Sequence, residues 1–173
     1  LGFGSGEHLV AQALAHPDVG LIGVEPYLNG MAACAQQIEA QGLRNIRLLG
    51  EPAEGLLAAL KPASIGRLFA LFSDPWPKAR HARRRLTRPE TLDHFARILA
   101  DGAELRLATD DPGYQRWLLS LVPLHPAFSW TARRAEDFRQ RPQDWPPTRY
   151  EAKALSAGRT PIYLTFKRRN RGA

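Results

Sequence analysis

The sequence lacks several features that mark common classes of protein. Its 173 residues include one cysteine, Cys34, which excludes a disulfide framework and a zinc site built from cysteines, and which is compatible with a reducing cytoplasm. No run approaches the roughly eighteen consecutive apolar residues of a membrane-spanning helix, so we expect no membrane partner. The histidines show no His-x-x-x-His spacing, and we predict no metal site. No Gly-x-Ser-x-Gly nucleophile elbow is present either.

Lysine is also scarce, because only 4 of the 24 basic residues are lysine and 20 are arginine. The net charge of +7 is unevenly distributed along the chain. Residues 1–66 carry 3 basic and 6 acidic side chains, whereas residues 67–173 carry 21 and 11. Such an asymmetry predicts a polyanionic partner for residues 67–173 only. Arginine suits that partner, since its guanidinium group binds phosphate with two parallel hydrogen bonds.

Apolar segments of strand length alternate with amphipathic segments of helix length. We expect helices over 7–16, 28–41, 53–60, 89–100, 112–121 and 148–157, and strands over 20–25, 45–49, 65–72, 103–109 and 161–167. This alternation predicts an α/β fold with a mostly parallel sheet in one domain, residues 1–173. The chain opens on a glycine-rich turn, which normally follows a strand. We therefore expect a further strand to precede Leu1 in the natural protein.

Three glycines and an acid form the first candidate site. Gly2, Gly4 and Gly6 allow a tight turn and a close approach of backbone to a ligand at the start of a helix. Glu25, at the end of the next strand, is placed to accept hydrogen bonds from two ribose hydroxyls. A dinucleotide fingerprint would need glycine at position 7, which is Glu7. The pattern favours S-adenosylmethionine, with another nucleotide or a plain tight turn as alternatives.

A second candidate site follows the strand predicted over 65–72. The loop Phe72-Ser73-Asp74-Pro75-Trp76-Pro77-Lys78 is stiffened by two prolines and lies where ligands bind in open parallel sheets. Asp74 and Lys78 would project from it with little freedom. The alternative is a structural turn in which Trp76 covers the core.

Two further segments carry charge near the same sheet edge. Residues 80–88 are rich in arginine, and we interpret them as a segment that binds phosphate through Arg80, Arg83, Arg84 and Arg85. The alternative is that these side chains only form the solvent-exposed start of a basic helix. Asp110 follows the strand over 103–109 and could act at the site or as a helix N-cap. Thr148 and Glu151 have the spacing of a capping box.

The segment from Phe72 to His81, together with Arg84-Arg85, resembles the signature of the bacterial tRNA (guanine-N7)-methyltransferases. The likeness covers nearly the whole chain and includes Gly2-Phe3-Gly4-x-Gly6-Glu7, Gly23-Val24-Glu25, Gly42-Leu43-x-Asn45, Ala108-Thr109-Asp110 and Thr148-x-Tyr150-Glu151. The resemblance implies a class I methyltransferase fold, with a seven-stranded, mostly parallel sheet whose last strand is antiparallel and whose first strand is missing from these residues. It also implies methyl transfer from S-adenosylmethionine to N7 of a guanine in the tRNA variable loop.

The resemblance also implies roles for individual residues. Residues 1–66 would mainly bind the cofactor, through Gly2, Gly4, Gly6, Glu25 and Glu51, and Asp74 in the second part of the chain would also contact it. Residues 67–173 would mainly bind tRNA, with Lys78, Asp110, Thr148, Arg149, Tyr150 and Glu151 on the substrate and Arg80, Arg83, Arg84 and Arg85 on phosphates. Asp74 would be the catalytic carboxylate. A monomer and a homodimer are both compatible with the sequence.

The sequence departs from the family pattern at two positions. Pro52 replaces an acid of the cofactor site, which leaves Glu51 as the nearest carboxylate, and Ser73 replaces a proline of the loop before Asp74. These departures keep two alternatives open. One is a non-catalytic tRNA-binding relative, and the other is a nucleotide-dependent oxidoreductase.

Overall fold

The computed structural model describes residues 1–172 as alternating helices and strands. The helices are α1 Glu7–Ala15, α2 Leu28–Ala40, α3 Ala53–Ala59, α4 Pro89–Ile98, α5 Pro112–Leu121, α6 Glu136–Arg139 and α7 Arg149–Ser156, with 3₁₀ turns η1 Ala79–Arg84 and η2 Val122–Leu124. The strands are β1 Leu21–Val24, β2 Ile46–Leu49, β3 Ile65–Leu71, β4 Leu99–Thr109, β5 Phe128–Trp130 and β6 Ile162–Arg168.

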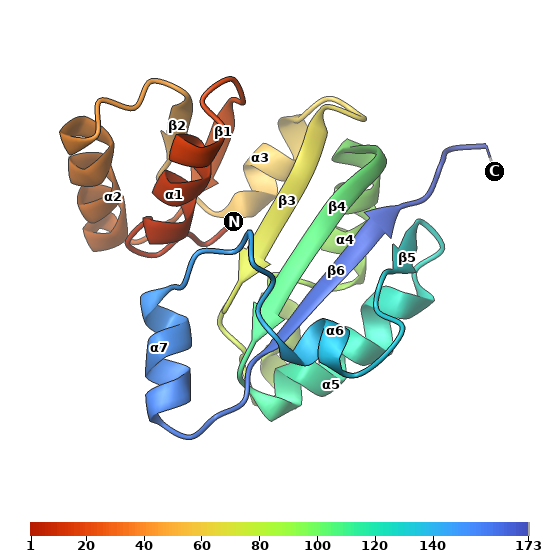
Figure 1. The fold of residues 1–173 in the computed structure, drawn as a ribbon. Helices are drawn as coiled ribbons and strands as arrows, with labels where there is room; N and C mark the ends of the chain where they lie inside the picture. The colour runs from red at the N-terminus through yellow and green to blue at the C-terminus, as the bar shows by residue number, and fades with distance from the viewer. Residues whose placement is uncertain (173) are drawn as a thin grey trace.

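The strands form two sheets that lie beside each other (Figure 1). β1 and β2 pair in parallel as a two-stranded sheet. The second sheet has the order β3-β4-β6-β5, in which β3 and β4 are parallel and β6 is antiparallel to both of its neighbours. The predicted α/β fold with an antiparallel last strand is therefore confirmed.

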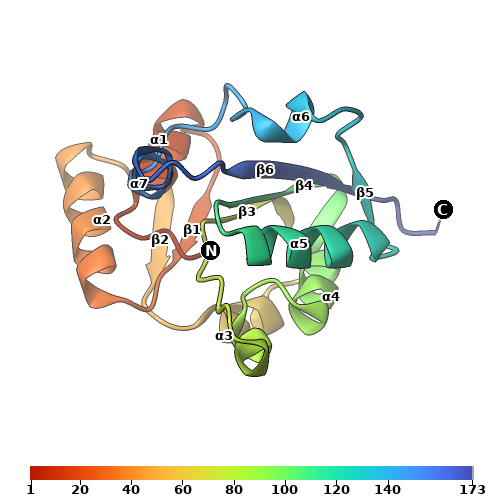
Figure 2. The ribbon, with the colours of Figure 1, turned by 90° about the horizontal axis from the view of Figure 1, so that it is seen from below.

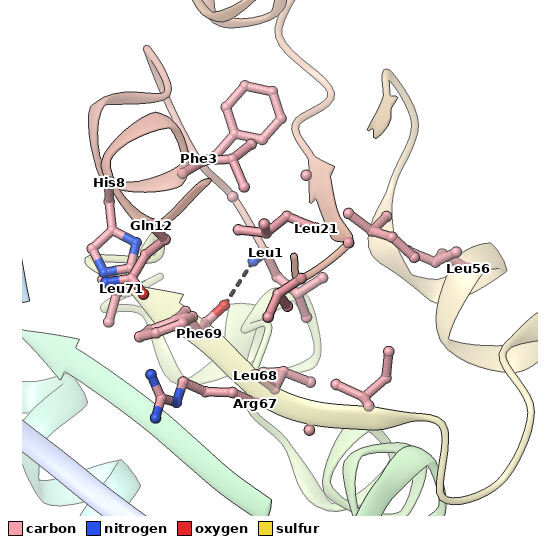
Figure 3. A pocket seen from close by; sticks show the side chains of 18 of the residues that line it. Leu1, Phe3, His8, Gln12, Leu21, Leu56, Arg67, Leu68, Phe69 and Leu71 are labelled. Atoms are coloured by element: carbon pink, nitrogen blue, oxygen red, sulfur yellow. Dashed lines mark hydrogen bonds between the residues drawn. The ribbon is translucent and has the colours of Figure 1, made fainter. Parts of the chain in front are cut away.

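A cavity of about 530 Å³ separates β1 from β3. Figure 3 shows its apolar walls, with Leu21 on one side and Leu68 and Phe69 on the other. The backbone nitrogen of Leu1 donates to the carbonyl of Phe69 at 2.7 Å, and the N–H of Gly2 donates to the carbonyl of Val24 at 2.7 Å. Residues 1–2 thus bond to both sheets.

Helices cover both faces of the strands. Figure 2, seen along the strands from below, shows α3, α4 and α5 on one face of the four-stranded sheet and α6 on the other. The main core lies under α4 and α5, where Leu92, Phe95 and Leu118 are almost fully buried against β4 and β6. A second core joins α1 and α2 to β1 and β2.

The structure corrects the predicted end of one helix and the start of one strand. The helix expected over 89–100 ends at Ile98, and β4 begins at once with Leu99 instead of at residue 103. Leu99 is fully buried and pairs with Ile65, and the register then shifts before Arg67. Gly102, with φ +78°, permits the irregularity in β4. No helix among residues 1–172 combines the length and apolar character needed to cross a membrane.

Candidate active site

The glycine loop and Glu25 meet at the carboxyl end of β1. The Glu25 side chain is buried, with 5% exposure, directly after Val24. Its Oε2 accepts the N–H of Gly4 at 2.9 Å, and its Oε1 accepts the N–H of Tyr27 at 3.1 Å. Each carboxylate oxygen keeps a free lone pair, because a carboxylate offers about four acceptor positions. The arrangement therefore fits a ribose with two adjacent hydroxyls.

The three glycines of the loop all have positive φ, at +68°, +57° and +91° for Gly2, Gly4 and Gly6. A Cβ on Gly2 would meet no atom within 4 Å, so this backbone is open to a ligand. A Cβ on Gly4 would lie 2.8 Å from the ring of Tyr150, and one on Gly6 would collide with Cys34. Gly4 and Gly6 are thus required for packing as well as for backbone conformation.

The adenine side of the predicted cofactor site has an acid only at Glu51. Pro52 is the N-cap of α3 and makes no side-chain cap, whereas Glu51 is exposed one residue earlier. Tyr27 and Leu28 are exposed large apolar side chains just after Glu25. They offer an apolar surface beside the ribose-binding acid, where a flat base could pack.

The loop after β3 carries Asp74 in a strained backbone. Phe72 and Trp76, which are bulky residues, have φ values of +52° and +43°. Such conformations persist only where surrounding contacts hold them, and they concentrate at functional sites. Asp74 is exposed, and within residues 1–172 no hydrogen bond or ion pair holds its carboxylate. The carboxylate is therefore free to face a ligand.

The basic run after this loop splits into exposed and buried members. Lys78 precedes η1, and it is exposed together with Arg80, Arg83 and Arg84. The guanidinium of Arg84 lies 4.9 Å from the centre of the Trp76 ring. Arg85 differs, because it is buried and its guanidinium donates to backbone carbonyls of the Asp74 loop.

Asp110 follows β4, on the same sheet edge as Asp74. Its carboxylate pairs with Arg159, which lies just after α7. The N-cap of α5 is Asp111, whose Oδ1 accepts the N–H of Tyr114 at 2.7 Å. The capping role weighed for Asp110 therefore belongs to its neighbour.

The N-terminus of α7 lies against the glycine loop. Thr148 caps the helix by accepting the N–H of Glu151 at 3.1 Å, which confirms one half of the predicted capping box. The Arg149 guanidinium donates to the Ser5 hydroxyl at 3.3 Å, and Tyr150 packs on Gly4. The structure thus brings the predicted substrate segment and the predicted cofactor loop into direct contact.

Glu151, in the first turn of α7, is buried and is held from two sides. It accepts a hydrogen bond from the Tyr163 hydroxyl and forms an ion pair with Arg141 at 3.0 Å. Burial, and then the nearby carboxylate of Glu151, raises the pKa of Tyr163 above its ordinary value. Sequence reasoning missed Tyr163 and Arg141, since they lie on other elements and no local motif connects them to Glu151.

The large cavity is not where the predicted acids lie. Its walls are mainly β1, β3, α1 and α3, and it reaches the site only at Gly2, Phe72, Thr148 and Tyr150. Glu25, Glu51, Asp74 and Asp110 do not line it. We therefore place the candidate active site at the sheet edge, between the glycine loop, the Asp74 loop and the start of α7.

Comparison with known proteins agrees with this geometry. Residues 1–164 match the model of a protein family described as "Putative methyltransferase". A "tRNA (guanine-N(7)-)-methyltransferase" of Rhodospirillum rubrum is 59% identical over 173 residues, which are 100% of this chain and 68% of that protein. The chain belongs to this methyltransferase family. A relative with the same description from Azorhizobium caulinodans is 48% identical over 168 residues, covering 97% of this chain and 73% of that protein. The resemblance based on the Asp74 loop is thereby confirmed.

Solved structures of distant methyltransferases support the fold. An rRNA methylase from Streptococcus thermophilus superposes with a TM-score of 0.63 at 13% identity, covering 97% of this chain and 83% of that one. A "putative methyltransferase from streptococcus mutans in complex with SAH" superposes with a TM-score of 0.61 at 13% identity, covering 96% and 84%. The predicted methyltransferase fold is therefore confirmed.

Proposed function

We propose that this protein transfers a methyl group from S-adenosylmethionine to N7 of a guanine in the variable loop of tRNA. The observation that carries the proposal is the position of the Asp74 loop. It follows β3 at the sheet edge, where Phe72 lines the same cavity as Gly2 of the glycine loop, in a chain 59% identical to a tRNA (guanine-N(7)-)-methyltransferase.

The first 66 residues supply the cofactor contacts in this proposal. When bound, S-adenosylmethionine supplies an activated methyl group on a positively charged sulfur. Glu25 binds the ribose hydroxyls with its two remaining acceptor positions, and Gly2 leaves room for the methionyl part. Glu51 replaces the missing acid at Pro52. The acidic surroundings of Glu7, Glu25 and Glu51 suit a cationic ligand.

Asp74 is the catalytic residue in this proposal. Guanine N7 has a lone pair in the ring plane, so no general base is needed and alignment supplies much of the rate. The purine becomes positively charged as the methyl group arrives. A fixed carboxylate beside the ring stabilises that charge more in the transition state than in the ground state.

The remaining residues, 67–173, bind tRNA. Arg80, Arg83 and Arg84 present exposed guanidinium groups next to the Asp74 loop and bind phosphates, while Lys78 and the start of α7 contact the target nucleotide. Asp110, which is only partly buried, is the acid available for the N1 and N2 donor edge of the guanine, and its ion pair with Arg159 holds it in place before tRNA binds. Glu151 is buried in its contacts with Tyr163 and Arg141, so in this proposal it fixes the start of α7 against which the nucleotide lies.

The variant Asp74→Asn tests the proposal, because the amide has the same shape without the charge. We expect kcat to fall at least about 100-fold, the scale of losing one electrostatic contact in a transition state. The Kd of S-adenosylhomocysteine and the melting temperature should stay close to wild type. Asp18→Asn, at an exposed position after α1, is the matched control. Turnover of Asp74→Asn equal to that of the control would contradict the assignment.

A further inference from the structure

Arg85 stands apart from the basic run to which it belongs in sequence. It follows η1 directly, yet its exposure is 8%, whereas Arg83 and Arg84 before it are exposed. No carboxylate pairs with it within the described part of the chain, residues 1–172. Burial of an unpaired guanidinium is costly unless other groups satisfy it. Its actual partners therefore indicate its role.

The partners of Arg85 are the two peptide groups that follow Asp74. Its Nε donates to the carbonyl of Pro75 at 2.9 Å, and its Nη2 donates to the carbonyl of Trp76 at 3.1 Å. The planar guanidinium also lies 4.7 Å from the centre of the Trp117 ring and 5.9 Å from that of Tyr114. Stacking of this kind stabilises a desolvated cation.

The loop has few other constraints. The N–H of Phe72 donates to Ala108 and the N–H of His81 donates to Lys78, but between them no backbone–backbone hydrogen bond holds residues 73–77 in the described structure. Pro75 and Pro77 have no N–H to donate. Phe72 and Trp76 are nevertheless held at positive φ. The two hydrogen bonds from the Arg85 guanidinium to the carbonyls of Pro75 and Trp76 therefore hold the backbone that follows Asp74.

Arg85 is itself anchored to α5. Two residues later, the Thr87 carbonyl accepts the indole N–H of Trp117 at 2.7 Å, and the Thr87 N–H donates to the Tyr114 hydroxyl at 3.3 Å. The chain from 85 to 87 is thus tied to the helix that also supplies the two stacking rings. Arg85 connects the Asp74 loop to the folded core through rigid contacts.

We propose that Arg85 is a positioning residue for catalysis, which holds the Asp74 carboxylate in its productive orientation and does not bind tRNA phosphate. The proposal rests on the catalytic role of Asp74 given above. Arg85→Lys keeps the charge but loses the planar fork, so the two carbonyls are no longer held in one fixed geometry. A displacement of about 1 Å at a reacting group can cost roughly 100-fold in rate.

The test measures steady-state methyl transfer by the full chain over a range of tRNA concentrations at saturating S-adenosylmethionine, which separates kcat from the KM for tRNA. Arg85→Lys should lower kcat about 10-fold or more, with the KM for tRNA and the slope of its salt dependence within twofold of wild type. Arg97→Lys is the matched control, because Arg97 also forks onto carbonyls, those of Leu57 and Leu60, but at the far side of α4. The Arg97→Lys variant should be less stable than wild type but should keep the wild-type kcat.

Two further measurements separate the possible outcomes. In an Asp74→Asn background the effect of Arg85→Lys should disappear, because the carboxylate it positions is gone. Trp117→Phe, which removes the indole N–H but keeps a ring, should lower kcat in the same direction by a smaller factor. This milder variant supplies the kinetic result if Arg85→Lys does not fold.

A rise in the KM for tRNA at unchanged kcat would overturn the proposal in favour of phosphate binding. An unchanged kcat in both Arg85→Lys and Trp117→Phe would overturn it as well, provided that Asp74→Asn is inactive. If Asp74→Asn itself keeps wild-type turnover, the proposed function fails first, and the inference about Arg85 fails with it.

Discussion

The glycines of the first loop look equivalent in sequence but meet different surroundings. Gly2 faces open space, Gly4 faces the ring of Tyr150, and Gly6 faces the buried thiol of Cys34. A glycine-rich motif predicts that backbone must turn or approach something closely. It does not say whether the neighbour is a ligand or another part of the protein, since that depends on α2 and α7, which come later in the chain.

Gly6→Ala should therefore destabilise the fold strongly. The new methyl group would collide with Cys34, and φ of +91° is unfavourable for any L-residue with a Cβ. We expect a loss of about 2–4 kcal/mol in the free energy of unfolding, combining strain and overpacking. Gly42→Ala, with φ +63° but open space around its Cβ, should lose only about 1–2 kcal/mol.

Denaturant unfolding of the two variants measures this difference. Adding Cys34→Ala to Gly6→Ala should recover part of the loss, because it removes the Sγ atom that lies nearest the new methyl group, although the Cβ of residue 34 at 2.7 Å remains. Equal losses in Gly6→Ala and Gly42→Ala would show that the contact with Cys34 is unimportant.

His8 should make stability depend on pH. It lines the cavity, its ring lies 4.5 Å from that of Phe69, and its Nε2 is buried without a partner within residues 1–172. Burial, followed by nearby positive charge that includes Arg106, lowers the pKa of His8 to about 4 from 6.5. The unfolded chain therefore takes up a proton below about pH 6.5, while the folded protein does not.

Stability should be highest above pH 6.5 and should fall as the pH drops towards 4. The contribution of His8 amounts to about 2 kcal/mol between pH 7 and 5. His8→Leu should flatten that part of the profile in denaturant unfolding, whereas His16→Gln, at the exposed end of α1, should leave it unchanged. A His8→Leu profile as steep as that of wild type would contradict this explanation.

At the level of elements, η1 and the residue after it contain arginines with two different roles that the sequence alone could not distinguish. Arg83, Arg84 and Arg85 are consecutive and chemically identical, yet two are exposed and one is buried against α5. The rings of Tyr114 and Trp117 that receive Arg85 lie about thirty residues later, so only the packing of α5 decides between the two roles. The pairs Asp110–Arg159 and Glu151–Tyr163 were hidden in the same way.

The exposed face of η1 should account for part of the salt dependence of tRNA binding. Replacing Arg80, Arg83 and Arg84 by Gln removes up to three phosphate contacts. Each contact contributes roughly 0.7–0.9 to the slope of log K against log salt, so we expect the slope to become less steep by about 2. Equilibrium binding of tRNA at several salt concentrations measures it.

The control for this triple variant lies in the other half of the chain. Arg44→Gln with Arg47→Gln neutralises two exposed cations before and within β2, which the proposed division leaves away from tRNA. Its slope should equal that of wild type. If the slope changes for the control and not for the η1 variant, tRNA binds the face that carries β2, and our proposal that it binds the face of η1 is contradicted.

For the whole molecule, the sequence predicted the order of elements well because strands such as Leu21–Val24 and Ile65–Leu71 are short, mostly apolar and bounded by turns. It also predicted that Asp74 and Asp110 share one sheet edge, since the parallel strands β3 and β4 end on the same side, whereas Glu25, expected at that edge too, follows β1 of the other sheet. It could not predict the division into two sheets around a cavity, or the contact of α7 with the glycine loop, because both depend on long-range packing.

The uneven charge of the chain acquires a physical interpretation in this arrangement. The acidic first part forms β1, β2 and the glycine loop, while the basic remainder forms the four-stranded sheet, η1 and α7. The two meet where Tyr150 packs on Gly4 and Arg149 bonds to Ser5. In the proposed function this is where a cationic cofactor and a polyanionic RNA are brought together.

The most direct test incubates the protein with S-adenosylmethionine labelled in its methyl group and with tRNA that has not been modified. Label should enter the tRNA, and strand cleavage specific for 7-methylguanine should map it to one guanine of the variable loop. Nicotinamide cofactors should not bind in a parallel titration. Tight tRNA binding without any transfer of label, or label at a base atom other than guanine N7, would contradict the proposed function.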